Sequence, residues 1–200
     1  MHKVFISYHH ANDQYYKEQL VAFAENRRIF IDCSVDTGDI DENLADEQIR
    51  QIIRDEYLKE SSVTILLVGT ATKNRKHVDW ELYSSMYDGA VNKKSGIIVV
   101  NLPSINCQSF RAGHLGEKQV VFPEQTVWES VNDRAEYERR YPYMPDRIID
   151  NLLNGTANIS VVPWSKVLDE EILRFMIDKA YEDREKSQYD LSRPMRKRNT

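Results

Sequence analysis

The segment HVDWELYSS, residues 77–85, places one carboxylate, Glu81, where it could do chemistry. Successive helical residues turn by about 100°, so Val78, Leu82 and Ser85 share a face that we expect to point into the core. Glu81 then lies at the margin of that buried face. The dipole of a first helical turn favours an ionised acid, typically by about 0.3–1 kcal/mol. Glu81 is therefore either an ordinary first-turn acid or a catalytic carboxylate at the mouth of a pocket.

Further polar side chains follow apolar runs that we expect to be strands. In open parallel sheets, ligands lie beyond the carboxyl ends of the strands, where connections leave in opposite directions. Three segments converge on that edge: SYHHAND, SVDTGD and GTATKNRKHVDWE. The side chains that they bring near Glu81 are Tyr8, His9, His10, Asp13, Asp36 and Arg75. Adjacent histidines without a third ligand at a suitable spacing do not indicate a metal site.

The elements that must position these residues alternate between strand and helix. The expected strands are KVFISY (3–8), IFIDCSV (29–35), SVTILLVG (62–69), GIIVVNLP (96–103) and ISVVPW (159–164). Helices are expected at about 13–27, around 49–57, from His77 onward and at 166–186. This alternation predicts the α/β class, with a flavodoxin-like doubly wound parallel sheet of about five strands and a helical C-terminal extension.

The chain is expected to form one domain over residues 1–187, with a core at 1–103. Residues 104–131 make a connection too long for a plain turn, which suggests a functional or family-specific role. The last strand and helix occupy about 159–187, and Pro163 suggests that this strand lies at a sheet edge. Residues 188–200 form a basic tail that we expect to be disordered.

Three aromatic residues, Trp80, Tyr83 and Tyr87, follow one another on the helix that carries Glu81. They face away from the core side. We expect them to be packed under the neighbouring helix or the 104–131 connection, within one chain. Rings left bare in the monomer would instead indicate an interface.

Composition limits the classes of function. Twenty-seven basic and 32 acidic residues give a net charge of −5, which argues against a nucleic-acid partner. Cys33 and Cys107 are too few and too far apart for a disulfide framework or a zinc site. No apolar run approaches the ~20 residues of a membrane helix, and the N-terminus does not resemble a signal peptide. We therefore expect a cytoplasmic protein without a membrane partner.

Two nucleotide- or phosphate-handling relatives of this architecture are excluded by the loops. No glycine-rich fingerprint follows the first strand, so an ordinary dinucleotide-binding Rossmann site is not expected. A response-regulator receiver needs paired acids after the first strand and a phospho-accepting Asp at the end of the third. Here those places hold SYHH and VGT.

The segments VFISYHHAND and VTILLVGTATKNRKHVDWEL resemble the TIR (Toll/interleukin-1 receptor) and TIR-like superfamily, closest to the bacterial Thoeris anti-phage branch. Ser7, Tyr8 and Asp13 fit the family's Ser-aromatic pair and following Asp. Glu81 fits the WVxxE start of the next helix, although His77 stands in place of the Trp. The resemblance covers about residues 1–103, and the remainder matches only by architecture.

The resemblance implies chemistry on NAD as a substrate, with no separate cofactor. Catalytic TIR proteins cleave the nicotinamide–ribose bond, and Thoeris members are similar to enzymes that release a cyclised ADP-ribose messenger to activate a separate effector. The sugar gains oxocarbenium character in this reaction, which a fixed carboxylate such as Glu81 stabilises. Nicotinamide is a good leaving group, so one carboxylate can suffice. Self-association remains open, since TIR domains do assemble.

The supporting residues keep two interpretations each. Tyr8 with His9 or His10 could hold the nicotinamide and ribose, or form a polar loop. Asp13 could cap the first helix instead of meeting a ligand. Asp36 is placed to meet ribose hydroxyls but belongs to an acidic loop. Arg75 could meet a diphosphate or belong to an ordinary basic surface.

Three functions follow from these observations. The first is a TIR-like NAD glycohydrolase or ADP-ribosyl cyclase that signals in phage defence. The second is a non-catalytic TIR-like sensor or adaptor that binds a protein partner or nucleotide, with a structural Glu81. The third is a nucleoside deoxyribosyltransferase-like enzyme with a Glu nucleophile. Release of nicotinamide from NAD separates the first from the others.

Overall fold

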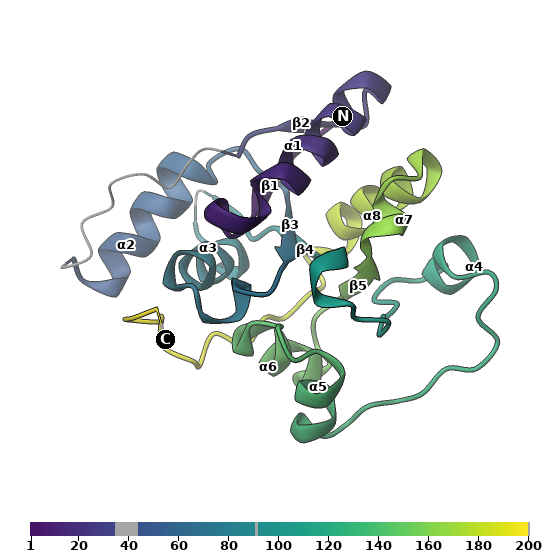
Figure 1. The fold of residues 1–200 in the computed structure, drawn as a ribbon. Coiled ribbons are helices and arrows are strands. Elements are labelled where there is room, and N and C mark those ends of the chain that lie inside the picture. Colours follow the sequence, from purple (N-terminus) through teal and green to yellow (C-terminus); the bar gives the residue numbers. More distant parts are fainter. Residues whose placement is uncertain (35–43, 91, 200) are drawn as a thin grey trace.

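The computed structural model describes residues 1–34, 44–90 and 92–199. Its centre is a five-stranded parallel sheet with the strand order β2-β1-β3-β4-β5 (Figure 1). The strands are β1 (His2–Ser7), β2 (Phe30–Asp32), β3 (Val63–Val68), β4 (Gly96–Asn101) and β5 (Ile159–Pro163). This order places the first strand between the second and third, as in flavodoxin-like sheets, and confirms the predicted fold class.

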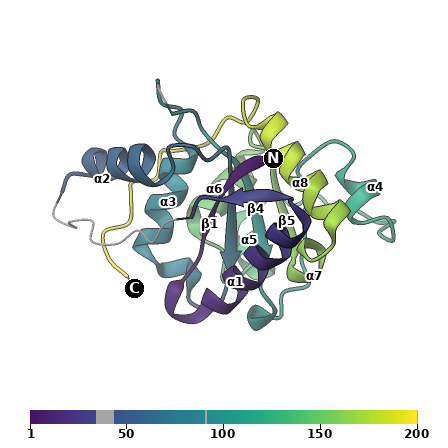
Figure 2. The same ribbon diagram turned by 90° about the horizontal axis from the view of Figure 1, so that it is seen from above.

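Helices cover both faces of the sheet (Figures 1 and 2). On one face lie α1 (His10–Arg27), α7 (Trp164–Val167) and α8 (Glu170–Asp183), with α4 (Glu117–Val121) beside α8. On the other lie α2 (Asp46–Ile52), α3 (Lys76–Met86), α5 (Arg134–Arg140) and α6 (Asp146–Asn154). A π-helical turn, Ile53–Tyr57, extends α2, and 3-10 turns occupy Thr72–Asn74 and Pro103–Ile105.

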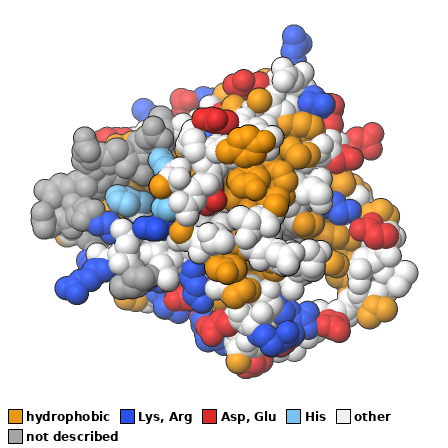
Figure 3. Space-filling model, in the orientation of Figure 1, with side chains coloured by type: hydrophobic (Ala, Val, Ile, Leu, Met, Phe, Trp, Pro, Cys, Tyr) orange, Lys and Arg blue, Asp and Glu red, His pale blue; other side chains and the backbone are white. Residues whose placement is uncertain are grey.

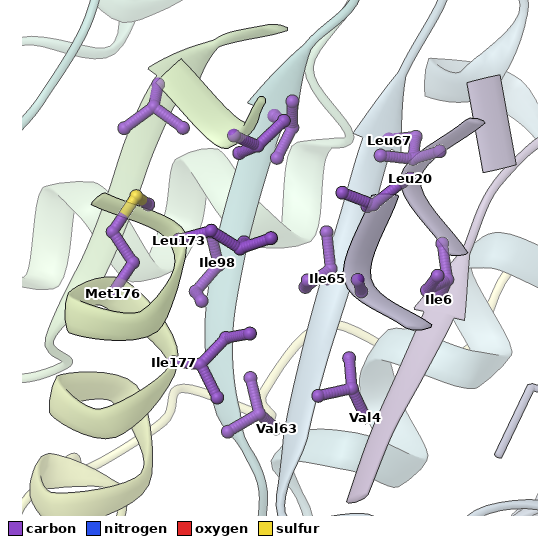
Figure 4. Close-up of a cluster of buried hydrophobic side chains, with 14 of the residues drawn as sticks. Val4, Ile6, Leu20, Val63, Ile65, Leu67, Ile98, Leu173, Met176 and Ile177 are labelled. Atoms are coloured by element: carbon purple, nitrogen blue, oxygen red, sulfur yellow. The ribbon is translucent and has the colours of Figure 1, made fainter. Parts of the chain in front are cut away.

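Strand β3 is the centre of the core, and all six of its residues are buried. Ile65 and Leu67 pack with Leu20 of α1 on one face, together with neighbours from α8 (Figure 4). Leu66 and Val68 pack on the other face with Val78 and Leu82 of α3. Each large apolar side chain buried in this way contributes roughly 1.5–3 kcal/mol. The two helices that flank the end of β1 are therefore fixed through the same strand.

The 104–131 connection is attached to the edge strand β5. Arg111 and Val161 form an antiparallel bridge, so the edge position suggested by Pro163 is confirmed and is partly covered. The buried carboxylate of Glu117 accepts hydrogen bonds from the backbone nitrogens of Gly113 and His114 and from Ser160 Oγ, at 2.7, 2.9 and 2.7 Å. None of the described helices is long and apolar enough to cross a bilayer.

Of the two covers predicted for the aromatic residues of α3, the neighbouring helix is confirmed, and the 104–131 connection is not the cover. Trp80 packs with Met195 and the residues of α2 and its π-helical turn, and Arg50 lies over the ring of Tyr87. Tyr83 packs in the same cluster, with the guanidinium of Arg147 over its ring. The connection cannot reach these rings because it is fastened to the opposite edge of the sheet.

The prediction of a disordered tail is wrong for residues 188–199. Met195 is buried, and Arg147 donates hydrogen bonds to the backbone oxygens of Arg193 and Pro194. The basic composition of this segment does not leave it in solvent, because buried partners on α3 and α6 accept or donate to its backbone. In Figures 1 and 2 it runs alongside α3 toward α2.

Candidate active site

Glu81 lies on the inner side of α3, next to the end of β1. Only 3% of the residue is exposed, so its expected position at the margin of the buried face is corrected to a buried one. Ser7 Oγ, at the last residue of β1, donates a hydrogen bond of 2.6 Å to Glu81 Oε2. Strand β1 alternates its side chains across the sheet, which turns Ser7 toward α3. The carboxylate is thereby held in one position between a strand and a helix.

Glu81 opens on a cavity of about 280 Å³ beyond the carboxyl ends of β1 and β3. The strand order reverses between β1 and β3, so the connections that follow these two strands leave in opposite directions. Ligands bind at this point in sheets of this architecture. The cavity is lined by Tyr8, His9, His10, Ala11, Arg75, His77, Val78, Glu81 and Asn199. The structure thus brings five predicted side chains, those of Tyr8, His9, His10, Arg75 and His77, together with Glu81. Histidines also gather beside Lys and Arg side chains in the surface view (Figure 3).

Tyr8 and His10 form one aromatic wall of the cavity. Their rings are stacked, with centroids 4.3 Å apart and planes inclined by 16°. The Tyr8 hydroxyl donates to Gln14 Oε1 at 2.5 Å, which fixes the ring against the first turns of α1. A preoriented aromatic face of this kind suits a flat heterocycle.

His9 and Arg75 give the cavity polar groups of defined charge. Burial, together with the nearby charges of Arg75 and His10, lowers the pKa of His9, which favours the neutral imidazole. Among the described residues, His9 Nδ1 and Arg75 Nε are buried without a hydrogen-bond partner. Buried polar atoms are usually paired, so these two are suited to meet a ligand.

Asp13 does not line the cavity. It follows the helix start at His9, whose backbone oxygen accepts its amide hydrogen bond at 2.9 Å, and its side chain does not cap the helix. The buried carboxylate instead lies against Gly69, where an added Cβ would be 2.4 Å from Oδ2. Burial raises the pKa of the Asp13 carboxyl to about 6. Gly69 therefore leaves room for an acid behind the site.

The remaining predicted residues have separate positions. His77 contacts Trp80 edge to face, with ring centroids 5.1 Å apart. Asp36 lies outside the described residues. Ser7 does not line the cavity but touches Glu81 directly. Nowhere in ranges 1–34, 44–90 and 92–199 do three His, Cys, Asp or Glu side chains gather as a metal ion would require.

Asn199 is a cavity residue that sequence reasoning missed. Its Oδ1 accepts a 2.9 Å hydrogen bond from the backbone nitrogen of Lys76, at the start of α3. Arg75, the N-cap residue of α3, offers no side-chain cap of its own. Asn199 therefore caps this helix from a distant part of the sequence. No local sequence pattern around Lys76 indicates such a contact.

A second, larger cavity of about 380 Å³ lies between the 104–131 connection, α5 and α6. Its charged groups already have partners: Arg140 pairs with Glu129 and Glu136, and Arg111 donates to the Ile159 backbone oxygen. Glu129 is its one acidic lining residue among those described, and it is mostly exposed. The smaller cavity, with its buried carboxylate, is the better candidate for chemistry.

A comparison with protein families matches the part of the chain that contains most of the residues of this site. The family model described as "Thoeris protein ThsB, TIR-like domain" matches residues 5–106, which is just over half of the chain. The match includes Ser7, the loop after β1 and Glu81. A comparison with curated proteins gives no match.

Proposed function

The chain belongs to the Thoeris ThsB family of TIR-like domains, and from that premise we propose that it is an NAD-cleaving enzyme of phage defence. Family membership supports a role in defence. The proposal adds that the enzyme breaks the nicotinamide–ribose bond of NAD and forms a cyclic ADP-ribose-type product. This product acts as a diffusible messenger that activates a separate effector protein.

The observation that carries the proposal is the buried carboxylate of Glu81 on the wall of a cavity at the β1–β3 switch point. Glu81 accepts a hydrogen bond from the Ser7 hydroxyl and lines the cavity together with His9, His10, His77 and Arg75.

The carboxylate suits the charge that develops during cleavage. As nicotinamide leaves, positive charge grows on the ribose, and a negative group fixed nearby stabilises it more than it stabilises the neutral sugar. Burial strengthens this effect because little water screens it. The hydrogen bond from Ser7 holds Glu81 in place, so no side-chain reorganisation is needed during the reaction.

The other groups suit the rest of the substrate. The stacked rings of Tyr8 and His10 offer a surface for nicotinamide, and neutral His9 offers a hydrogen bond to a ribose hydroxyl. The Arg75 guanidinium suits the diphosphate. At about 280 Å³ the cavity is at the small end of ligand sites, roughly 300–1,000 Å³, so it fits the nicotinamide riboside end rather than a whole dinucleotide.

The test compares Glu81→Gln with the wild-type protein. Glutamine keeps the size and the acceptor for Ser7 but removes the charge. We expect nicotinamide release and cyclic product to fall on the order of a hundredfold or more. Glu117→Gln is the matched control, since Glu117 is also buried but lies outside the cavity. Both should be measured on purified protein and in phage-infected cells, because activity could require a trigger.

Equal product from the wild type and Glu81→Gln, at equal protein level, would contradict the mechanism. Protection of cells by a wild-type protein that forms no product would favour the sensor or adaptor function. Exchange of deoxynucleoside bases without NAD cleavage would indicate the deoxyribosyltransferase-like function.

A further inference from the structure

The larger cavity, of about 380 Å³, lies where the 104–131 connection meets α5 and α6. A neighbouring cavity of about 370 Å³ shares four of its lining residues, which are Phe110, Trp128, Glu129 and Arg140. All of them lie outside the matched range 5–106, so the family match assigns no role to them. The volume of the larger cavity falls within the range of small-molecule sites, roughly 300–1,000 Å³.

One wall of the larger cavity is aromatic. The rings of Phe110 and Phe122 are stacked, with centroids 4.3 Å apart, and Trp128 meets both rings edge to face at 5.7 Å. Phe122 is buried in the core, so it holds the other two rings in place. Leu152 and Leu153 of α6 add aliphatic lining. Preformed apolar walls of this kind suit an aromatic ligand body.

The lining also contains a buried hydroxyl group. Tyr141 is only 4% exposed, and its ring stacks on that of Tyr137 with centroids 6.3 Å apart. Its hydroxyl makes no hydrogen bond to any of the described residues. Burial raises the pKa of this hydroxyl, so it keeps its proton and is a donor. Since buried polar groups are usually paired, the Tyr141 hydroxyl is suited to a ligand that accepts a hydrogen bond.

Two cations line the cavity without an acidic partner in the part of the chain that the structure describes, Arg111 and Lys118. The backbone of Arg111 is fixed by the bridge to Val161, and its Nη1 donates to the backbone oxygen of Ile159 at 2.6 Å. A guanidinium carries five N–H donors, so most of those of Arg111 remain available. Lys118 lies over the ring of Trp128, with its Nζ 4.4 Å from the ring centroid.

The described lining therefore carries an excess of positive charge. Arg140 is paired with Glu129, whereas Arg111 and Lys118 remain unbalanced, in a protein whose net charge is −5. A cavity with an excess of one sign of charge concentrates ions of the other sign. The guanidinium of Arg111 and the hydroxyl of Tyr141 supply N–H and O–H donors, which carboxylate and phosphate groups accept strongly.

We propose that this cavity is a second ligand site, specific for a small organic anion with an aromatic body. Arg111 and Tyr141 bind the anionic group, and Lys118 adds positive charge. The rings of Phe110 and Trp128 bind the body. The site shares no lining residue with the Glu81 cavity, so the proposal does not depend on NAD cleavage.

The test compares three probes that have the same ring system: 1-naphthoate, 1-naphthyl phosphate and the neutral 1-naphthamide. Isothermal titration calorimetry measures their affinities for the full chain. We expect at least one of the two anions to bind at least tenfold more tightly than the amide, because hydrogen bonds to charged groups are the stronger ones. The anion that binds more tightly identifies carboxylate or phosphate as the group recognised. No preference for either anion over the amide would overturn the proposal.

Tyr141→Phe tests whether the preferred anion binds in this cavity. The substitution removes only the hydroxyl, and it should lower affinity for that anion about tenfold with little change for the amide. Stability should remain close to that of the wild type, because the hydroxyl has no partner to lose. Tyr143→Phe is the matched control, since Tyr143 does not line the cavity, and it should leave all three affinities unchanged.

Arg111→Met tests the charge. It should lower affinity for the preferred anion about tenfold or more, again with little change for the amide. Arg184→Met is the control, because Arg184 Nη1 also donates to a backbone oxygen, that of Tyr181, but lies outside the cavity. If Arg111→Met does not fold, Tyr141→Phe decides alone.

Two outcomes with these variants would overturn the proposal. The first is an anion preference that survives in Tyr141→Phe and in Arg111→Met. The second is a preference that is lost in Arg75→Met but kept in Arg111→Met, because Arg75 lines the Glu81 cavity and the anion would then bind there.

Discussion

At the residue scale, the pair formed by Ser7 and Glu81 joins β1 to α3. Both residues are buried, and the 2.6 Å hydrogen bond is short, as bonds to an ionised oxygen usually are. The pair therefore serves both the fold and the proposed chemistry. Substitutions at Ser7 and at Glu81 separate the contribution of the pair to stability from its contribution to the proposed chemistry.

Ser7→Ala should destabilise the protein by about 1–3 kcal/mol, because Glu81 would lose a donor inside the protein. NAD cleavage should fall less than in Glu81→Gln, since the charge remains but its position is less fixed. Urea unfolding and initial rates measure the two effects. Ser84→Ala is the control: Ser84 is buried on the same helix, but its Oγ has no hydrogen-bond partner among the described residues. A Ser7→Ala protein as stable as Ser84→Ala would contradict this account.

The Asp13 carboxyl should make stability depend on pH. Its pKa is raised to about 6, because burial disfavours the charged form. The folded state therefore binds this proton more tightly than the unfolded state does, and the stabilisation is complete below about pH 4 and is lost as pH rises through 6. The difference amounts to about 3 kcal/mol.

Asp13→Asn removes this titration. Relative to the wild type, the variant should gain stability as pH rises from 5 to 8, which melting temperatures at the two pH values will show. Glu171→Gln, at the exposed start of α8, is the control. If the difference in melting temperature between the wild type and Asp13→Asn is the same at both pH values, Asp13 does not titrate in this range.

At the element scale, the position of α3 depends on groups that come from three parts of the chain. Its inner face packs on β3, its first turn is capped by Asn199, and its Asp79 is paired with Arg147 of α6. Glu81 lies two residues beyond Asp79 on this helix. The ion pair between Asp79 and Arg147 therefore helps to position both the candidate site and the C-terminal segment, residues 190–199.

Arg147→Ala should cost about 3–5 kcal/mol of unfolding free energy, since it leaves Asp79 buried and unpaired. The double variant Arg147→Met with Asp79→Leu should recover part of that loss, because neither charge remains to be desolvated. Denaturant unfolding gives both values. Arg139→Ala, which removes an exposed ion pair with Glu136 on α5, should change stability little. Equal losses for Arg147→Ala and Arg139→Ala would show that the Asp79 pair is not buried in solution.

At the scale of the whole molecule, the third apolar cluster joins segments from distant parts of the sequence. Five of its buried residues come from five segments: Phe5 of β1, Ile49 of α2, Ile53 of the turn that follows α2, Trp80 of α3, and Met195 of the C-terminal segment, residues 190–199. The C-terminal segment thus completes a part of the core in which the indole ring of Trp80 would otherwise be exposed.

Met195→Ala should destabilise the protein by about 2–4 kcal/mol through the cavity that it leaves. Thermal or urea unfolding measures the loss. Val127→Ala is the control, because Val127 is 69% exposed and should matter little. If residues 188–199 were disordered, as their composition alone suggests, the Met195 substitution would be equally harmless.

The sequence by itself determined the fold class and the neighbourhood of Glu81. Apolar runs of strand length alternate with helical periodicity, and that alternation leaves few arrangements other than a parallel sheet with helices on both faces. Carboxyl ends of parallel strands share one edge, so Tyr8, His9 and Arg75 could be grouped with Glu81 before any coordinates. Each of these inferences uses only a local pattern and a general rule of topology.

The tertiary structure alone decided how deeply Glu81 is buried, where Asp13 points and what covers α3. A helical wheel shows which residues share a face, but burial depends on what lies against that face, and here Ser7 comes from another element. Asp13 turned toward Gly69 because that glycine leaves space for it. The basic composition of residues 188–200 predicts disorder. The order of residues 188–199 depends instead on Arg147, Asp79 and Trp80, partners so distant in sequence that no periodic pattern links them.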